Sequence, residues 1–120
     1  MLISWLVGLM IRGCWMEIKE AQKMVDEFIM EYGGYWEPLS MMARITEEVG
    51  ELARAMNIKY GGKKSKGEGD GRDIEKELVD VLFTVLALAN MEKIDIEKEF
   101  VEKVGHDHDK CEKVDGGALE

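Results

Sequence analysis

Two stretches of the chain, TEEVGELARA at 46–55 and EKELVDVLFTVLALAN at 75–90, decide its fold. In both stretches apolar residues recur at the three- and four-residue spacing of an α-helix, and neither stretch contains proline. The second stretch is apolar around most of its circumference, which is typical of a buried helix. The two stretches therefore predict two helices, of which the second is the more deeply buried.

The same spacing on either side of these stretches predicts an all-α chain. Helices are expected at about 16–32, 38–59, 73–91 and 95–104. Gly33 and Gly34 end the first helix, and Pro38, a residue favoured in the first turn of a helix, begins the second. Because short connections between helices favour antiparallel neighbours, we predict an antiparallel bundle of four main helices.

Two segments are expected to lie outside this bundle domain, which spans 16–104. The segment 60–72 is rich in glycine and charge and has no apolar anchor, so a mobile surface loop is expected there. Residues 105–120 are expected to form a flexible tail.

The first fifteen residues, MLISWLVGLMIRGCW, form an apolar extension. The apolar run is too short to span a bilayer, which takes about 20 residues, and it lacks the basic start and cleavage site of a secretory signal. We interpret 1–15 as a start-site artefact or a loosely attached extension. The alternative is a peripheral membrane contact through Trp5, Leu6 and Leu9, and no stable membrane association is expected.

Composition excludes some classes of function. The 120 residues are enough for one core, and a domain this small gains from burial against a second copy. A net charge of −9 argues against binding of a nucleic acid polymer, because such proteins present a basic face. Cys14 and Cys111 are too few for a disulfide framework or a zinc site, so a reducing, cytoplasmic location is expected.

The second predicted helix carries acidic residues beside its apolar stripe. Glu47, Glu48 and Glu51 fall within an arc of about 100° on the helix surface. The apolar stripe consists of Met42, Ile45, Val49, Leu52 and Met56. Like charges this close repel one another, so a positive charge is expected between them.

The third predicted helix carries Glu77 and Asp80, three residues apart on one face. Asp80 opens an apolar run, where an ionised carboxylate without a partner costs several kcal/mol. Antiparallel pairing of the two helices can bring these acids opposite Glu48 and Glu51, and a site of carboxylate oxygens alone selects magnesium, manganese or calcium. The alternative is that all these acids form an ordinary solvated helix face, and periodicity alone leaves both interpretations open.

The two acidic motifs also resemble a known family. EEVGE at 47–51, followed after the glycine-rich loop by ELVD at 77–80, resembles the paired EExxE and ExxD motifs of the MazG-like nucleotide pyrophosphohydrolases. The resemblance covers about 16–103. It implies an all-α fold completed by oligomerisation, as a homodimer or homotetramer. It also implies cleavage of a nucleoside or deoxynucleoside triphosphate between the α and β phosphates, which yields a monophosphate and pyrophosphate.

The resemblance further implies roles for single residues. By motif position Glu48, Glu51, Glu77 and Asp80 would be the Mg²⁺ ligands, with Mn²⁺ as a substitute, and Glu47 would bind through water or orient the attacking water as the catalytic carboxylate. Weaker candidates for contact with the nucleotide are Trp36, Asn90, Lys63, Lys64, Lys66, Lys93 and Lys103. Trp36 could equally be a core anchor, and Asn90 a helix cap.

Three other functions were weighed. A ferritin-like di-metal oxidase needs Glu-x-x-His pairs, and His106 and His108 lie outside the predicted bundle, so this function is set aside. A phosphoribosyl-ATP pyrophosphatase-like enzyme shares the bond cleavage, and a non-catalytic metal-binding helical dimerisation module would keep the acids for structure alone. Both remain open, as do the preferred base and sugar and a role in cleansing the nucleotide pool.

Overall fold

The computed structural model describes residues 15–61 and 74–115, and these residues form helices without a strand. The helices are α2 (Ile18–Glu31), α3 (Pro38–Tyr60), α4 (Ile74–Met91) and α5 (Ile96–Asp115). The predicted all-α class is therefore confirmed, and the first three predicted helices agree with the observed ones to within two residues. Most of the predicted loop 60–72 lies outside the described residues, and so does the extension 1–14.

The end of the fourth helix was predicted wrongly. Helix α5 continues to Asp115, whereas a helix ending near residue 104 and followed by a tail was expected. Gly105 costs only about 1 kcal/mol relative to alanine inside a helix, and no proline follows it. Lys103 Nζ lies 2.6 Å from Asp107 Oδ2, one turn further along, and such pairs support an exposed helix. The glycine and the charged composition therefore do not end the helix.

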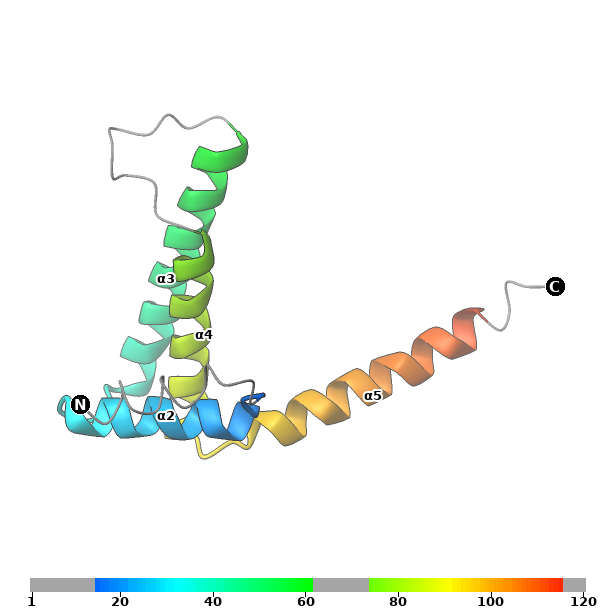
Figure 1. Cartoon of the computed structure of the whole chain (residues 1–120), viewed down its shortest axis with the longest axis horizontal. Coiled ribbons are helices and arrows are strands. Elements are labelled where there is room, and N and C mark those ends of the chain that lie inside the picture. Colours follow the sequence, from blue (N-terminus) through cyan, green and yellow to red (C-terminus); the bar gives the residue numbers. More distant parts are fainter. Residues whose placement is uncertain (1–14, 62–73, 116–120) are drawn as a thin grey trace. The chain divides into compact units, whose positions relative to one another are not determined.

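The chain divides into two compact units, residues 22–94 and residues 1–21 with 95–120. In the unit 22–94, α3 and α4 run antiparallel along each other (Figure 1). Buried apolar side chains of the unit are Met41 and Ala55 of α3 together with Leu86, Ala87 and Ala89 of α4. The α3–α4 pair is the framework on which the other side chains of the unit are placed.

Helix α2 is attached to α4 by a polar contact and an aromatic one. Gln22 Nε2 donates to Asn90 Oδ1 at 3.0 Å and to the Ile94 carbonyl at 2.9 Å, and Asn90 Nδ2 donates back to the Gln22 carbonyl at 2.8 Å. Further along α2, the rings of Phe28 and Phe83 meet edge to face with centroids 5.6 Å apart. Both contacts are within the unit 22–94 and fix α2 across one end of the α3–α4 pair (Figure 1).

Two tight helix ends return the chain to this framework. Gly33, at φ +108°, follows α2, and the Gly34 N–H donates to the Ile29 carbonyl at 2.8 Å. Glycine adopts this left-handed conformation without the steric penalty of a Cβ. Lys93, at φ +57°, ends α4 in the same way, although it carries a side chain. The predicted stop at Gly33 and Gly34 is confirmed.

The apolar stripe predicted for the second helix is only partly buried. Met42, Val49 and Met56 of α3 are exposed, and so are Leu78, Leu82 and Val85 of α4. We call these six residues the apolar face. Each α3 member follows directly after a buried residue, and the same holds for two of the α4 members. One residue on from a buried position, the side chain is rotated by about 100° around the helix axis. In an antiparallel pair this rotation brings the side chains of both helices to the same side of the pair.

The prediction that the third helix is the most deeply buried is confirmed, because α4 has five buried residues against three in α3. One side of α4 packs on α3, while the side that carries Leu82 is open. No helix among the described residues has the length and apolar character needed to cross a membrane.

Replacement of Leu86 tests the core of the unit 22–94. Leu86 is buried, so Leu86→Ala leaves a cavity and is expected to lower the free energy of unfolding by about 2–5 kcal/mol. Leu39→Ala removes the same atoms from an exposed side chain in the first turn of α3 and is expected to change it by less than about 0.5 kcal/mol. Urea unfolding followed by circular dichroism measures both, and equal effects would contradict the burial of Leu86.

Replacement of Asn90 tests the attachment of α2. Asn90→Ala leaves the Gln22 carbonyl and amide without these hydrogen bonds, and is expected to lower the free energy of unfolding by about 1–3 kcal/mol. Asn57→Ala, at an exposed position of α3, is the matched control and is expected to be nearly neutral. Thermal and urea unfolding give the measurement, and an Asn90→Ala protein as stable as this control would refute a structural role for the pair.

Candidate functional site

Three carboxylates converge where α3 and α4 touch. Glu48 and Glu51 lie one turn apart on α3 and Glu77 lies on α4, and one oxygen of each falls within 4.8 Å of the others. Glu48 is 2% exposed and Glu77 4% exposed. Two acids buried in a helix contact lose hydration worth several kcal/mol each, so this group needs compensating positive charge. The structure thus brings together three of the four predicted metal ligands.

The carboxylate of Glu48 is compensated only in part. Its Oε1 lies 2.5 Å from Nη2 of Arg44, whereas its Oε2 is buried with no hydrogen-bond partner in the described part of the chain. Burial raises the pKa of Glu48 and the neighbouring acids raise it further, while only Arg44 opposes them. A buried oxygen without a donor, beside two further carboxylates, matches the all-oxygen ligand set that Mg²⁺ or Mn²⁺ prefers.

Asp80 and Glu47, the other predicted acids, lie outside this trio. Asp80 is exposed, and its negative charge acts on Glu48 from the α4 side. The side chain of Glu47 is 67% exposed, with Oε2 3.5 Å from Nη1 of Arg44. The two acids therefore flank the trio, in which Glu48 and Glu77 are buried, rather than complete it.

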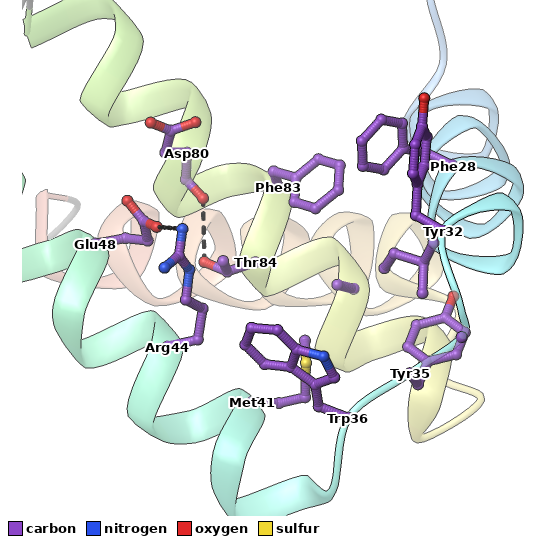
Figure 2. A pocket seen from close by; sticks show the side chains of 13 residues that line it. Phe28, Tyr32, Tyr35, Trp36, Met41, Arg44, Glu48, Asp80, Phe83 and Thr84 are labelled. Atoms are coloured by element: carbon purple, nitrogen blue, oxygen red, sulfur yellow. Dashed lines mark hydrogen bonds and ion pairs between the residues drawn. The ribbon is translucent and has the colours of Figure 1, made fainter.

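A cavity of about 460 Å³ opens beside the trio. Figure 2 shows Glu48, Arg44 and Asp80 at one end, Phe28, Tyr32 and Tyr35 at the other, and Trp36 and Phe83 between them. The aromatic residues that line it are Phe28, Tyr32, Tyr35, Trp36 and Phe83. The cavity therefore joins an acidic end, suited to a cation, to an aromatic end, suited to a flat apolar ring.

Tyr35 is held in this cavity by a short hydrogen bond. Its hydroxyl donates to Asp26 Oδ1 at 2.5 Å. Burial, and then the bond to Asp26, raise the pKa of Tyr35 to about 12. The phenol is therefore neutral at physiological pH, and it acts as a fixed wall rather than as an acid or base.

The predicted nucleotide-contact residues fall into three groups. Trp36 lines the cavity and is 62% exposed, which excludes the core-anchor interpretation. Asn90 and Lys93 do not line it: Asn90 joins α4 to α2, and Lys93 ends α4. The lysines of the glycine-rich segment, Lys63, Lys64 and Lys66, lie outside the described residues.

Lys103, His106 and His108 belong to the unit formed by residues 1–21 and 95–120. Lys103 pairs with Asp107 on the surface of α5. Within the described residues, His106 and His108 belong to no cluster of three ligands that could hold a metal ion.

Several residues of the cavity were missed in the sequence. Arg44 stands four residues before Glu48, a spacing that marks an ion pair on one helix face, and this signal was available. Thr84 has no comparable signal, because its hydroxyl donates to the Val81 carbonyl at 2.8 Å. Phe28 and Phe83 are 55 positions apart, so only the attachment of α2 reveals that they share a cavity.

Known proteins with the same pattern share this fold. Residues 36–112 match the model of the MazG nucleotide pyrophosphohydrolase domain. The YpjD protein of Bacillus subtilis (strain 168) is 46% identical over 82 residues, which cover 68% of this chain and 74% of YpjD.

Two solved structures are similar. A Bacillus-conserved MazG protein, a nucleotide pyrophosphohydrolase, superposes with a TM-score of 0.64 at 42% identity, covering 77% of this chain and 90% of that one. Bacillus subtilis YpjD superposes with a TM-score of 0.68 at 41% identity, covering 78% and 94%. With the paired acidic motifs placed at one helix contact, this chain belongs to the MazG nucleotide pyrophosphohydrolase family, a family of hydrolases that act on nucleotides.

Proposed function

We propose that the chain is a Mg²⁺-dependent pyrophosphohydrolase that cleaves a nucleoside or deoxynucleoside triphosphate to the monophosphate and pyrophosphate. The observation that carries this proposal is the convergence of Glu48, Glu51 and Glu77, within 4.8 Å, at the mouth of an aromatic cavity. An acidic protein repels a triphosphate unless cations intervene, and the buried acids supply a place for such cations.

The proposed metal ligands are Glu48, Glu51, Glu77 and Asp80, with Mn²⁺ as a substitute for Mg²⁺. A bound Mg²⁺ would neutralise phosphate oxygens and lower the pKa of a coordinated water. Glu48 and Glu77 are held rigidly by burial, while Asp80, at the rim, is free to reach a more solvated position. Buried and exposed acids together suit a site in which carboxylates bind a cation on one side and the other side of the cation stays open to phosphate.

Glu47 is the proposed catalytic carboxylate. It is exposed, adjoins Arg44, and is separate from the buried trio, so it is able to accept a hydrogen bond from an incoming water. Its role is to orient or deprotonate that water for in-line attack on the α phosphorus. The attack breaks the bond from the α phosphorus to the bridging oxygen, so pyrophosphate leaves with that oxygen.

The aromatic end of the cavity is the proposed place for the base. Trp36 presents an exposed ring there, and stacking of a base on an aromatic ring is worth about 1–3 kcal/mol in proteins that bind single-stranded nucleic acids. Because aromatic faces accept any base, this end supports binding of nucleotides in general, which suits a substrate range that includes non-standard triphosphates.

The apolar face supports a homodimer, or a homotetramer built from such dimers. Its six side chains are exposed along two adjacent helices, and an apolar surface of this kind favours association. A second copy of the same face is the proposed partner, because two antiparallel helix pairs that pack together make a four-helix bundle.

Product analysis with two matched variants tests the reaction. The wild type with Mg²⁺ is expected to release monophosphate and pyrophosphate from a panel of canonical and deoxynucleoside triphosphates, and EDTA should stop it. Loss of a residue that only contacts a metal ligand costs about 10–100-fold in metal affinity. Glu48 is itself a proposed ligand, so Glu48→Gln should weaken Mn²⁺ binding, measured by electron paramagnetic resonance, by at least about 100-fold. Glu47→Gln should lower kcat by about 10²–10⁴-fold and leave Mn²⁺ binding largely intact.

Glu92→Gln, which removes one exposed carboxylate near the end of α4, serves as the control. A folded wild type that binds Mn²⁺ and turns over no member of the panel would exclude a general triphosphate pyrophosphohydrolase. Phosphoribosyl-ATP would then be the next substrate to assay, and lack of turnover there too would leave the non-catalytic module.

A charge placed on the apolar face tests the assembly. Leu82→Glu puts a carboxylate at an exposed position of this face, and burial of that charge against a second copy would cost several kcal/mol. Sedimentation equilibrium should show two or four chains for the wild type and one chain for the variant. Val101→Glu, on α5, is the control and should keep the wild-type mass. A monomeric wild type would refute the proposal.

A further inference from the structure

Arg44 is the only arginine or lysine among the residues that line the described cavity. Its charge is permanent, because a guanidinium does not lose its proton in a protein. The other charged residues of the lining, Glu48 and Asp80, are acids. Any anionic group of a ligand that enters this end therefore meets one fixed cation of the chain itself, besides whatever metal ion is bound.

The guanidinium of Arg44 is oriented before a ligand arrives. Nη2 lies 2.5 Å from Glu48 Oε1, and Nη1 lies 3.5 Å from Glu47 Oε2. The two ion pairs hold the planar group on the α3 wall of the cavity, while the side chain as a whole remains 47% exposed. A guanidinium carries five N–H donors in one plane, so two ion pairs leave donors on its open side.

The position of Arg44 along the cavity indicates which part of a ligand it meets. Figure 2 shows its guanidinium next to Glu48, with Trp36 and Met41 further along the α3 side. In a nucleotide the first phosphate is separated from the base only by the sugar. With the base at Trp36 and the outer phosphates toward the acids, the α phosphate is the one that comes next to Arg44.

We propose that Arg44 binds the α phosphate of the nucleotide, held in place for this by its ion pairs with Glu47 and Glu48. The assignment rests on the proposed function of the cavity and adds a phosphate ligand from the chain itself. A planar guanidinium donates two parallel hydrogen bonds to two phosphate oxygens, which a lysine ammonium cannot reproduce. Because the monophosphate product retains the α phosphate, Arg44 also contributes to its affinity.

A purely structural role for Arg44 makes a different prediction. If Arg44 serves only to neutralise Glu48, its removal destabilises the protein, and the gain in affinity that a ligand obtains from its phosphate stays unchanged. If Arg44 binds the phosphate, this gain falls while binding of the bare nucleoside does not. The ratio of the two affinities therefore separates the two roles without any measurement of turnover.

Binding of two nucleoside and monophosphate pairs is the test. Isothermal titration with saturating Mg²⁺ measures adenosine against AMP and thymidine against dTMP, on the wild type, Arg44→Gln and Arg44→Lys. In the wild type the monophosphate should bind more tightly than the nucleoside. In Arg44→Gln this ratio should fall by at least tenfold, about 1.4 kcal/mol, with nucleoside affinity within about twofold of wild type. Lys59→Gln removes one exposed charge from α3 outside the cavity and should keep the wild-type ratio.

Arg44→Lys guards against a trivial loss of folding. It keeps a cation beside Glu48, so its fold should survive, and its ratio should lie between those of the wild type and Arg44→Gln. A wild-type ratio retained in Arg44→Gln or in Arg44→Lys overturns the assignment of Arg44 and leaves the proposed function standing. A wild type that binds neither member of either pair overturns the nucleotide role of the cavity, and the assignment of Arg44 falls with it.

Discussion

Burial of two carboxylates in the contact between α3 and α4 is the constraint on which the site depends. Glu48 and Glu77 occupy positions where an apolar side chain would be the stabilising choice, and each loses hydration worth several kcal/mol. Alanine at 55 and 87 keeps the two helices close, so the acids are confined to a small volume. Stability alone does not account for acids at these positions, whereas the proposed binding of a divalent cation would.

The rest of the unit 22–94 places an aromatic wall beside these acids. This wall consists of the aromatic residues that line the cavity, which are Phe28, Tyr32, Tyr35, Trp36 and Phe83. The Gln22–Asn90 hydrogen bonds attach α2 to the end of α4, and the left-handed Gly33 turns the chain toward Trp36. The wall therefore depends on contacts remote from the acids. A residue such as Asn90 can matter for nucleotide binding without touching the nucleotide, because it fixes the helix that carries Phe28.

Sequence periodicity could predict the helices and the face of each helix that carries Glu48, Glu51 or Glu77, because these follow from spacing along a single helix. It left open whether the acids form a site. It could not predict which side of α3 faces α4. Ile45 and Leu52 are half-buried, and the predicted apolar stripe continued from them to Met42, Val49 and Met56. The residues that are buried stand one position earlier, at Met41, Glu48 and Ala55. Spacing also did not show that Asp80 is exposed and lies outside the trio of Glu48, Glu51 and Glu77. Arg44 went unnoticed because a pair at i and i+4 is ordinary on a helix surface, and its importance follows from the cavity alone.

The one-residue offset between the buried row and the apolar face has a consequence for function. A step of about +100° from the buried positions leads to Met42 and Leu78, whereas a step of three residues, about −60°, leads to Arg44 and Asp80. The apolar face and the cavity thus lie on opposite sides of the α3–α4 pair. In the proposed dimer a second copy covers the apolar face and leaves the cavity open to substrate. Any influence of association on catalysis must then pass through the helix contact itself, where Glu48 is held, and not through contact of the partner with the aromatic wall.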